Sequence, residues 1–244
     1  RVAMNLYQPS SRNGKMVKRL FPWLHWLPLV RKMVHATPSK YRLNENMNKL
    51  LGQVFHESEL EFAIFFGTPC VHQKITMQVS KGSRILGYCK VTDSKEIASL
   101  FRQEERILNQ MEERQMEGLP RCLYCGQTEI GCYLFNQSTT KTQKSKVVHE
   151  WTALHDAFLH QMERNTRQTV LFEQSDYYRT LHDLRQHIVW LPKYADGGFI
   201  ENVVEKTIAK GRGKEVEYSA YHADFTPWNM FVESGKLFVF DWEY

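Results

Sequence analysis

Between residues 61 and 135, the spacing of apolar positions predicts an antiparallel sheet with one long helix inserted in it. Short runs of apolar or alternating residues are separated by turn residues, such as Gly82. Residues 95–113 carry apolar side chains at helical spacing, so we expect a helix there. The strands are expected at residues 62–66, 74–79, 84–91, 121–126 and 132–135.

Beyond residue 135 the pattern becomes mainly helical. Residues 136–146 are rich in Ser, Thr, Gln and Lys, which is typical of a linker between two lobes. We expect three helices after it: residues 147–162, a second helix from a cap at Ser175-Asp176 to Pro192, and residues 199–209. Strand patterns return after Gly213.

Charge separates the first 50 residues from the rest of the chain. They hold ten Lys or Arg and one acidic residue, Glu45, whereas the residues after 50 hold 22 Lys or Arg and 26 Asp or Glu. Between residues 15 and 35, Trp and Leu stand beside Lys and Arg, which is the composition of a segment lying in a membrane interface. A helical arm packed on the main domain is the alternative. Nucleic acid is not an expected partner, because no base-reading motif accompanies the charge.

Composition excludes several classes of protein. Hydrophobic residues make up 42% and aromatic residues 13%, which excludes a disordered chain. No run approaches the roughly 18 consecutive apolar residues that a membrane-spanning helix needs. Five cysteines, an odd number, favour a reducing compartment, so we expect a cytoplasmic protein. The basic segment at 15–35 adds the hypothesis of peripheral contact with the inner face of a membrane. Cys122, Cys125 and Cys132 are expected to be buried strand cysteines rather than zinc ligands, because no second Cys pair is present.

The residues best suited to catalysis or metal binding lie near the carboxyl end. Ser234-Gly235-Lys236 separates two apolar runs and predicts a hairpin. With those three residues as the loop, Asn229 would face Asp241 across the two strands. Amide and carboxylate oxygens suit a hard cation such as Mg²⁺, and Asp224 in the preceding loop could orient a hydroxyl and take its proton.

The stretch from His222 to Asn229 (HADFTPWN), followed by Phe240-Asp241-Trp242-Glu243, resembles the aminoglycoside phosphotransferase and choline kinase family. These small-molecule kinases share the bilobal protein-kinase-like fold. The resemblance implies that Asp224 is the catalytic carboxylate, that Asn229 and Asp241 hold Mg²⁺, and that His222 braces the loop. The family usually has Gly where this chain has Ala223.

The first half of the chain offers an independent check on the resemblance to small-molecule kinases. The resemblance implies a lysine on the third strand that holds the α- and β-phosphates of ATP, and a helix glutamate that holds this lysine. Lys90 lies in the third predicted strand, and Glu104 lies near the centre of the apolar stripe of the helix, with Glu105 toward its edge. A carboxylate on a buried face is costly unless it meets a cation, so we expect Glu104 to pair with Lys90. A solvated lysine and an exposed helical ion pair are the alternative. A phosphate-covering loop is expected at 67–70.

These observations predict an α+β chain with a bilobal protein-kinase-like fold. A basic arm at 1–50 would precede an N-lobe at 51–137, made of a five-stranded antiparallel sheet with one helix. A mainly helical C-lobe at 138–244 would be incomplete, because members of the family continue with further helices. The expected function is ATP- and Mg²⁺-dependent transfer of a γ-phosphoryl group to a hydroxyl of a small molecule or sugar. A metal-dependent hydrolase using Asp224 and Asp241, and a non-catalytic binding module, are the alternatives.

Overall fold

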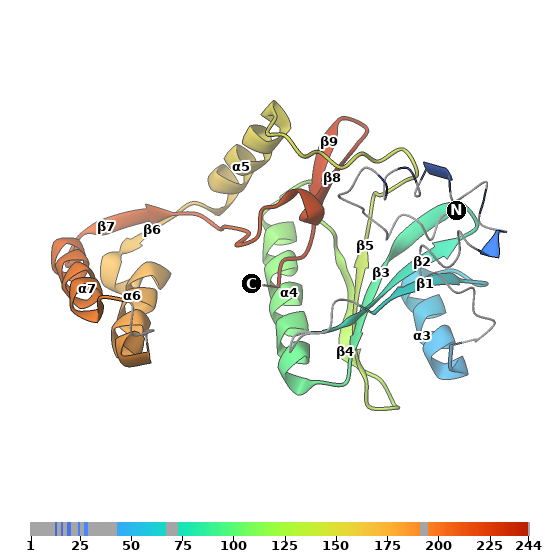
Figure 1. Cartoon of the computed structure of the whole chain (residues 1–244), viewed down its shortest axis with the longest axis horizontal. Helices are drawn as coiled ribbons and strands as arrows, with labels where there is room; N and C mark the ends of the chain where they lie inside the picture. Colours follow the sequence, from blue (N-terminus) through green and yellow to red (C-terminus); the bar gives the residue numbers. More distant parts are fainter. Residues whose placement is uncertain are drawn as a thin grey trace. The chain divides into compact units, whose positions relative to one another are not determined.

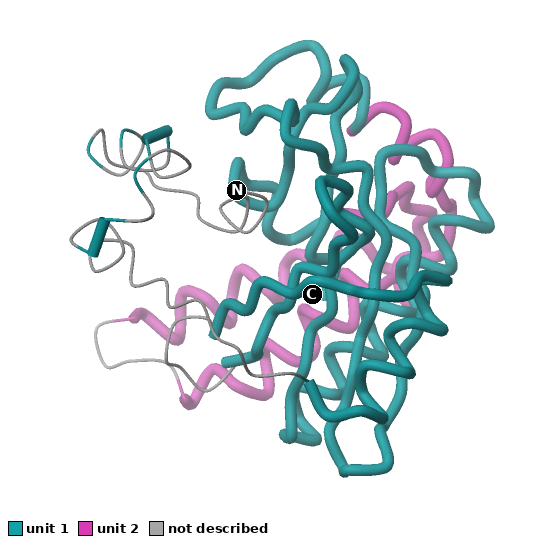
Figure 2. The backbone as a smooth tube through the Cα atoms, turned by 90° about the vertical axis from the view of Figure 1, so that its right-hand side faces the viewer, with its two compact units in different colours: residues 1–158, 222–244 teal, residues 159–221 magenta. Residues whose placement is uncertain are grey.

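The computed structural model describes residues 43–66, 73–190 and 195–243, with a few positions between 13 and 28. The predictions for the segment at 15–35 and for the loop at 67–70 therefore fall outside the described residues, apart from a few positions of the former. The chain divides into two compact units, residues 1–158 with 222–244 and residues 159–221 (Figure 2). The lobe boundary at residue 138 stays a prediction.

The first unit is built around a five-stranded antiparallel sheet with the strand order β1-β2-β3-β5-β4. The predicted strands and the helix α4 (Lys95–Glu113) are confirmed, and Ser94 caps α4 by accepting a hydrogen bond from the backbone N–H of Ile97 at 3.3 Å. The last strand continues to Ser138, so the predicted linker begins three residues too early. The strands are β1 (Glu61–Phe65), β2 (Ile75–Lys81), β3 (Arg84–Thr92), β4 (Cys122–Gln127) and β5 (Tyr133–Ser138).

The two faces of this sheet are covered by different helices (Figure 1). The sequence did not predict helix α3 (Glu45–Phe55), whose apolar side packs on one face. The residues buried together there are Met47, Leu51, Phe55, Met77, Val79, Cys89 and Leu134. Because side chains alternate along a strand, Lys90 and Phe135 point to the opposite face, where Phe135 meets Phe101 of α4 with ring centroids 6.0 Å apart.

A short hairpin, β8 (Met230–Glu233) and β9 (Lys236–Val239), follows the 3-10 turn Pro227–Asn229. The predicted three-residue loop is wrong, because the strands pair Glu233 with Lys236 and leave a two-residue loop. Its residues, Ser234 and Gly235, both have positive φ (51° and 77°), which suits the two-residue turns that match strand twist. The register therefore moves by one residue: the N–H of Phe240 donates to the carbonyl of Asn229 at 2.9 Å, and Asp241 lies beyond the pair.

The second unit has its own small core. Helices α6 (Asp176–His187) and α7 (Gly197–Gly211) bury Phe172, Leu181, Val204 and Ile208. The Ser175 cap of α6 is confirmed, since its hydroxyl accepts from the N–H of Tyr178 at 3.1 Å. Two 3-10 turns, Phe172–Gln174 and Ile188–Trp190, and the strand pair β6 (Gln168–Leu171) and β7 (Glu215–Tyr218) complete it.

The helix predicted at 147–162 is displaced. Helix α5 spans Ala153–Thr166, and the backbone N–H of Thr152 donates to Nδ1 of His155 at 3.0 Å at its start. The preceding Trp151 is 60% exposed rather than part of a buried stripe. None of the helices in the described part of the chain is both long and apolar enough to cross a membrane.

Candidate functional site

Lys90 is the centre of a cluster of charged side chains on the α4 face of the sheet. Its Nζ lies 2.6 Å from Oε2 of Glu104, 2.6 Å from Oδ1 of Asp241 and 3.6 Å from Oε2 of Glu243. The Lys90 side chain is 5% exposed. One ammonium group therefore joins the sheet, helix α4 and the segment after β9.

Glu104 is held from two sides. It is fully buried in α4, and besides Lys90 it accepts a hydrogen bond from the backbone N–H of Trp242 at 3.3 Å. The indole N–H of Trp242 donates in turn to the carbonyl of Val239 at 3.1 Å. The carboxylate thus fixes the backbone that carries Asp241 against the helix.

Two residues of this cluster received no role from the sequence, Lys74 and Glu243. Lys74 directly precedes β2, and its Nζ contacts Oε2 of Glu243 and lies 3.6 Å from Oδ1 of Asp241. Because Thr76 pairs with Lys90, alternation places Lys74 on the same face of the sheet. A signal for Glu243 was present, since it stands two residues from Asp241 in the motif that carries the resemblance. Nothing in the local pattern distinguished Lys74 from a solvated lysine.

The charges of the cluster favour the ionised forms of Lys90 and Asp241. Burial alone would lower the pKa of Lys90, but Glu104, Asp241 and Glu243 outweigh it and raise its pKa above the ordinary value. Burial would likewise raise the pKa of Asp241, yet Lys90 and Lys74 bring it down to about 2. For Glu104 burial dominates over the attraction of Lys90, so its pKa is raised.

Asp224 lies in the loop before the hairpin and is oriented by Asn229. The amide nitrogen of Asn229 donates to Oδ2 of Asp224 at 2.8 Å and to its carbonyl at 3.1 Å. The structure thus brings these two residues together, whereas Asp241 is engaged by the lysines. Ala223, just before Asp224, has φ of 66°, in the left-handed region that favours glycine.

His222 braces the same loop. Its Nε2 lies 2.9 Å from the carbonyl of Phe240, an acceptor, so this nitrogen carries the proton and donates. The ring meets the indole of Trp242 edge to face, with centroids 4.4 Å apart. Burial lowers the pKa of His222, which favours the neutral ring.

The residues present fit a hard divalent cation. Carboxylate oxygens of Glu104, Asp241 and Glu243 lie within 4.8 Å of one another. Oxygen donors of this type are the ligands that Mg²⁺ prefers. Glu104 is committed to Lys90 and Trp242, which leaves Asp241 and Glu243 as the better ligands. Asn229 uses its amide nitrogen on Asp224, so its oxygen is the atom that could act as a ligand.

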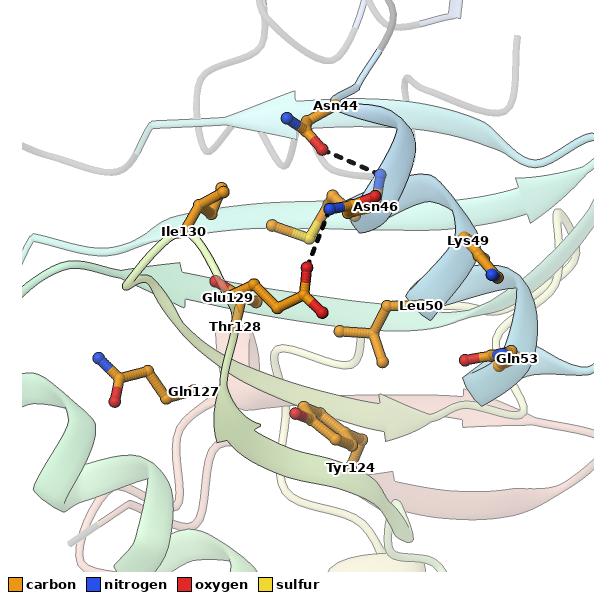
Figure 3. Close-up of a pocket in the computed structure, with 11 residues that line it drawn as sticks. Asn44, Asn46, Lys49, Leu50, Gln53, Tyr124, Gln127, Thr128, Glu129 and Ile130 are labelled. Carbon is orange, nitrogen blue, oxygen red and sulfur yellow. Dashed lines mark hydrogen bonds between the residues drawn. The ribbon is translucent and has the colours of Figure 1, made fainter.

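A separate pocket of about 380 Å³ lies between the start of α3 and the turn that joins β4 to β5 (Figure 3). A hydrogen bond of 3.0 Å from Asn46 to Glu129 spans it, and Tyr124 and Leu50 also line it. Tyr124 packs with the α3 core, so the pocket belongs to the sheet face opposite Lys90. None of the residues of the charged cluster lines it.

The fold is similar to that of a protein assigned as a fructosamine-3-kinase from Haemophilus somnus 129PT. The TM-score is 0.50 at 12% sequence identity, over 81% of this chain and 71% of that chain. The ternary complex of APH(2")-IIa with streptomycin and ATP aligns with a TM-score of 0.48 at 12% identity, over 83% of this chain and 71% of that chain. No family model and no curated protein matches the sequence. The first likeness shows the fold, and the predicted protein-kinase-like α+β class is confirmed.

Proposed function

We propose that this chain is an ATP- and Mg²⁺-dependent phosphotransferase that moves the γ-phosphoryl group to a hydroxyl of a small molecule or sugar. The observation that carries the proposal is the buried lysine of the third strand, Lys90, held by Glu104 of α4 and by Asp241. In kinases of this fold, a strand lysine paired with a helix glutamate grips the nucleotide phosphates. In this proposal residues 51–137 form the nucleotide-covering lobe and residues 138–244 belong to the second lobe.

Each side chain has a distinct part in the reaction. Lys90 binds the α- and β-phosphates, and Glu104 keeps its ammonium group in place. Asp241 and Glu243 would hold Mg²⁺, with the side-chain oxygen of Asn229 as a further ligand, and an ion held there would supply positive charge beside the phosphate oxygens. His222 positions the loop through the carbonyl of Phe240.

Asp224 supplies the general base. Its carboxylate is oriented by Asn229, so that it can accept the proton of the acceptor hydroxyl. The hydroxyl oxygen then forms a bond to the γ-phosphorus, and the bond between that phosphorus and its bridging oxygen breaks, leaving ADP. The proton ends on Asp224. Catalysis of this kind depends mainly on positioning and charge stabilisation, and the hydrogen bond from Asn229 to Asp224 supports the positioning part of the proposal.

The test is metal-dependent nucleotide binding by the whole chain, measured as a thermal shift. We expect ATP with Mg²⁺ to raise the melting temperature, and ATP with a chelator to raise it less. Asp241→Asn should lose the metal-dependent part, while Asp183→Asn, an exposed aspartate of α6, should keep it. An equal shift in wild type and Asp241→Asn would contradict the proposed metal site.

Turnover separates the proposal from its alternatives. ADP that forms only with a hydroxyl acceptor supports a phosphotransferase. ADP and free phosphate formed at the same rate without any acceptor indicate a hydrolase. Nucleotide binding with no ADP under either condition indicates a binding module.

The basic segment at 15–35 supports a second, separate part of the proposal, contact with an anionic membrane surface. Its Trp, Leu, Lys and Arg content suits the boundary between lipid headgroups and acyl chains. Retention by anionic but not by neutral vesicles is the expected result, and equal retention by both would contradict it.

A further inference from the structure

Lys74 is a second lysine at the centre of the site, and its surroundings differ from those of Lys90. Lys90 touches all three carboxylates of the cluster and is 5% exposed. Among the residues that the structure describes, Lys74 forms ion pairs only with Asp241 and Glu243, and its side chain is 18% exposed. Lys74 is therefore on the more open side of the cluster, whereas Lys90 is enclosed by it.

The two carboxylates that Lys74 contacts are the two best suited to hold a divalent cation. An ammonium group and a metal ion cannot approach the same oxygens together without strong mutual repulsion, because two positive charges about 4 Å apart repel even in a partly screened site. The structure thus shows a lysine where a competing cation would have to bind.

We propose that Lys74 is a mobile nucleotide-binding cation that exchanges Asp241 and Glu243 for a phosphate oxygen when a divalent cation binds these carboxylates. The inference rests on the proposed function and adds a residue and a coupling to it. In the arrangement seen here, Lys74 neutralises Asp241 and Glu243. The lysine side chain is flexible and ends in a compact point charge, so its Nζ can move without displacing β2, and such a charge binds phosphate well.

Charge balance gives this exchange its direction. The cluster contains two ammonium groups and three carboxylates, so its charges nearly cancel. A divalent cation would leave the cluster with excess positive charge unless an anion binds at the same time. A nucleotide phosphate supplies that anion, and Lys74 is the cation with the greater freedom to reach it. The mechanism predicts that metal and nucleotide favour each other's binding, because Lys74 leaves Asp241 and Glu243 free for the metal and takes up a phosphate oxygen of the nucleotide.

The test uses the whole chain with Lys74→Met and, as matched control, Lys81→Met at the other end of β2, where Lys81 pairs with Glu57 at 43% exposure. Mn²⁺ binding without nucleotide is measured by electron paramagnetic resonance, and ATP binding at saturating Mn²⁺ by calorimetry. Because removal of Lys74 removes a competitor, Lys74→Met should bind Mn²⁺ about fivefold more tightly, and it should bind ATP about fivefold more weakly. Lys81→Met should match wild type in both.

The decisive feature is that Lys74→Met should change the affinities for Mn²⁺ and for ATP in opposite directions. Weaker ATP binding with unchanged or weaker Mn²⁺ binding would overturn the exchange, and unchanged binding of both would overturn any role of Lys74 while leaving the proposed function intact. If wild type binds neither Mn²⁺ nor ATP, the proposed function is contradicted, and the exchange at Lys74 with it. Lys74→Arg, which keeps the charge, is the second variant in case Lys74→Met does not fold. Its affinity for ATP should be close to that of wild type.

Discussion

Lys90 and Glu104 form a buried ion pair, with Nζ and Oε2 2.6 Å apart and both side chains at most 5% exposed. Removing two charges from water is expensive, and their attraction repays the cost only where further hydrogen bonds satisfy the remaining atoms. Here Asp241 and the N–H of Trp242 supply those contacts. The pair therefore depends on the whole cluster.

The first prediction is that Lys90→Met destabilises the protein more than Glu104→Gln does. Without Lys90, three carboxylates within 4.8 Å of one another face the single ammonium of Lys74, which should cost about 3 to 5 kcal/mol. Glu104→Gln leaves two carboxylates and two lysines and should cost about 1 to 2 kcal/mol. Urea unfolding of both variants and of the double variant measures this. Equal losses, or the reverse order, would show that the charges are not coupled as described.

A second prediction concerns the loop of Asp224. Ala223 has φ of 66°, a region that costs an L-residue about 1 to 2 kcal/mol and costs glycine little. After the greater chain entropy of glycine is subtracted, Ala223→Gly should raise the free energy of unfolding by up to about 1 kcal/mol. Ala98→Gly, within helix α4, is the control and should lower it by about 1 kcal/mol. A loss of stability in Ala223→Gly would mean that the backbone there is not left-handed in solution.

The third prediction is a pH dependence that arises from His222. Burial lowers the pKa of His222 below the ordinary 6.5, so the unfolded chain takes up a proton before the folded chain does. This contribution to stability is complete above pH 6.5 and is lost as the pH falls from there through the folded pKa.

The measurement is the free energy of unfolding between about pH 7 and pH 5. His222→Gln keeps an amide N–H that can donate to Phe240, and its stability should fall less steeply than that of wild type. His149→Gln, at an exposed position, should follow wild type. Identical slopes for His222→Gln and wild type would refute the prediction.

A fourth prediction concerns Asn136 in β5, which is completely buried between Cys89 and Tyr124 on neighbouring strands. Neither polar atom of its amide has a hydrogen-bond partner among the described residues. Because an unsatisfied buried amide costs about 1 to 3 kcal/mol, Asn136→Leu should increase stability by about 1 to 2 kcal/mol. Asn136→Asp should decrease it strongly, since it buries a charge. A destabilised Asn136→Leu in urea unfolding would indicate that the amide is satisfied in solution.

Several elements could be predicted because their signals are local. The bounds of α4 follow from apolar spacing, and the same stripe placed Glu104 on the buried side, where the structure has it. The hairpin was expected, but its register was not, since Ser234-Gly235-Lys236 suits a two-residue as well as a three-residue loop, and the pairing of Glu233 with Lys236 distinguishes them. One residue of slip was enough to separate Asn229 from Asp241 as cross-strand partners.

Helix α3 was missed although its signal is local, because the Asn44 side chain caps it and Met47, Leu51 and Phe55 recur every four residues on its buried side. The four-residue strand β6 has no such signal, since it is defined by pairing with β7 far along the chain.

The sequence by itself determined the five strands of the main sheet, helix α4 and the residue types gathered near the carboxyl end, because periodicity and turn chemistry act over a few residues. Only the tertiary structure decided that Lys74 meets Glu243, 169 residues away, and that Lys90 meets Asp241, 151 residues away. Such pairs form because burying an unpaired charge costs free energy, so each buried charge is stable only beside an opposite one. Which residues pair depends on how the sheet, α4 and the final segment pack.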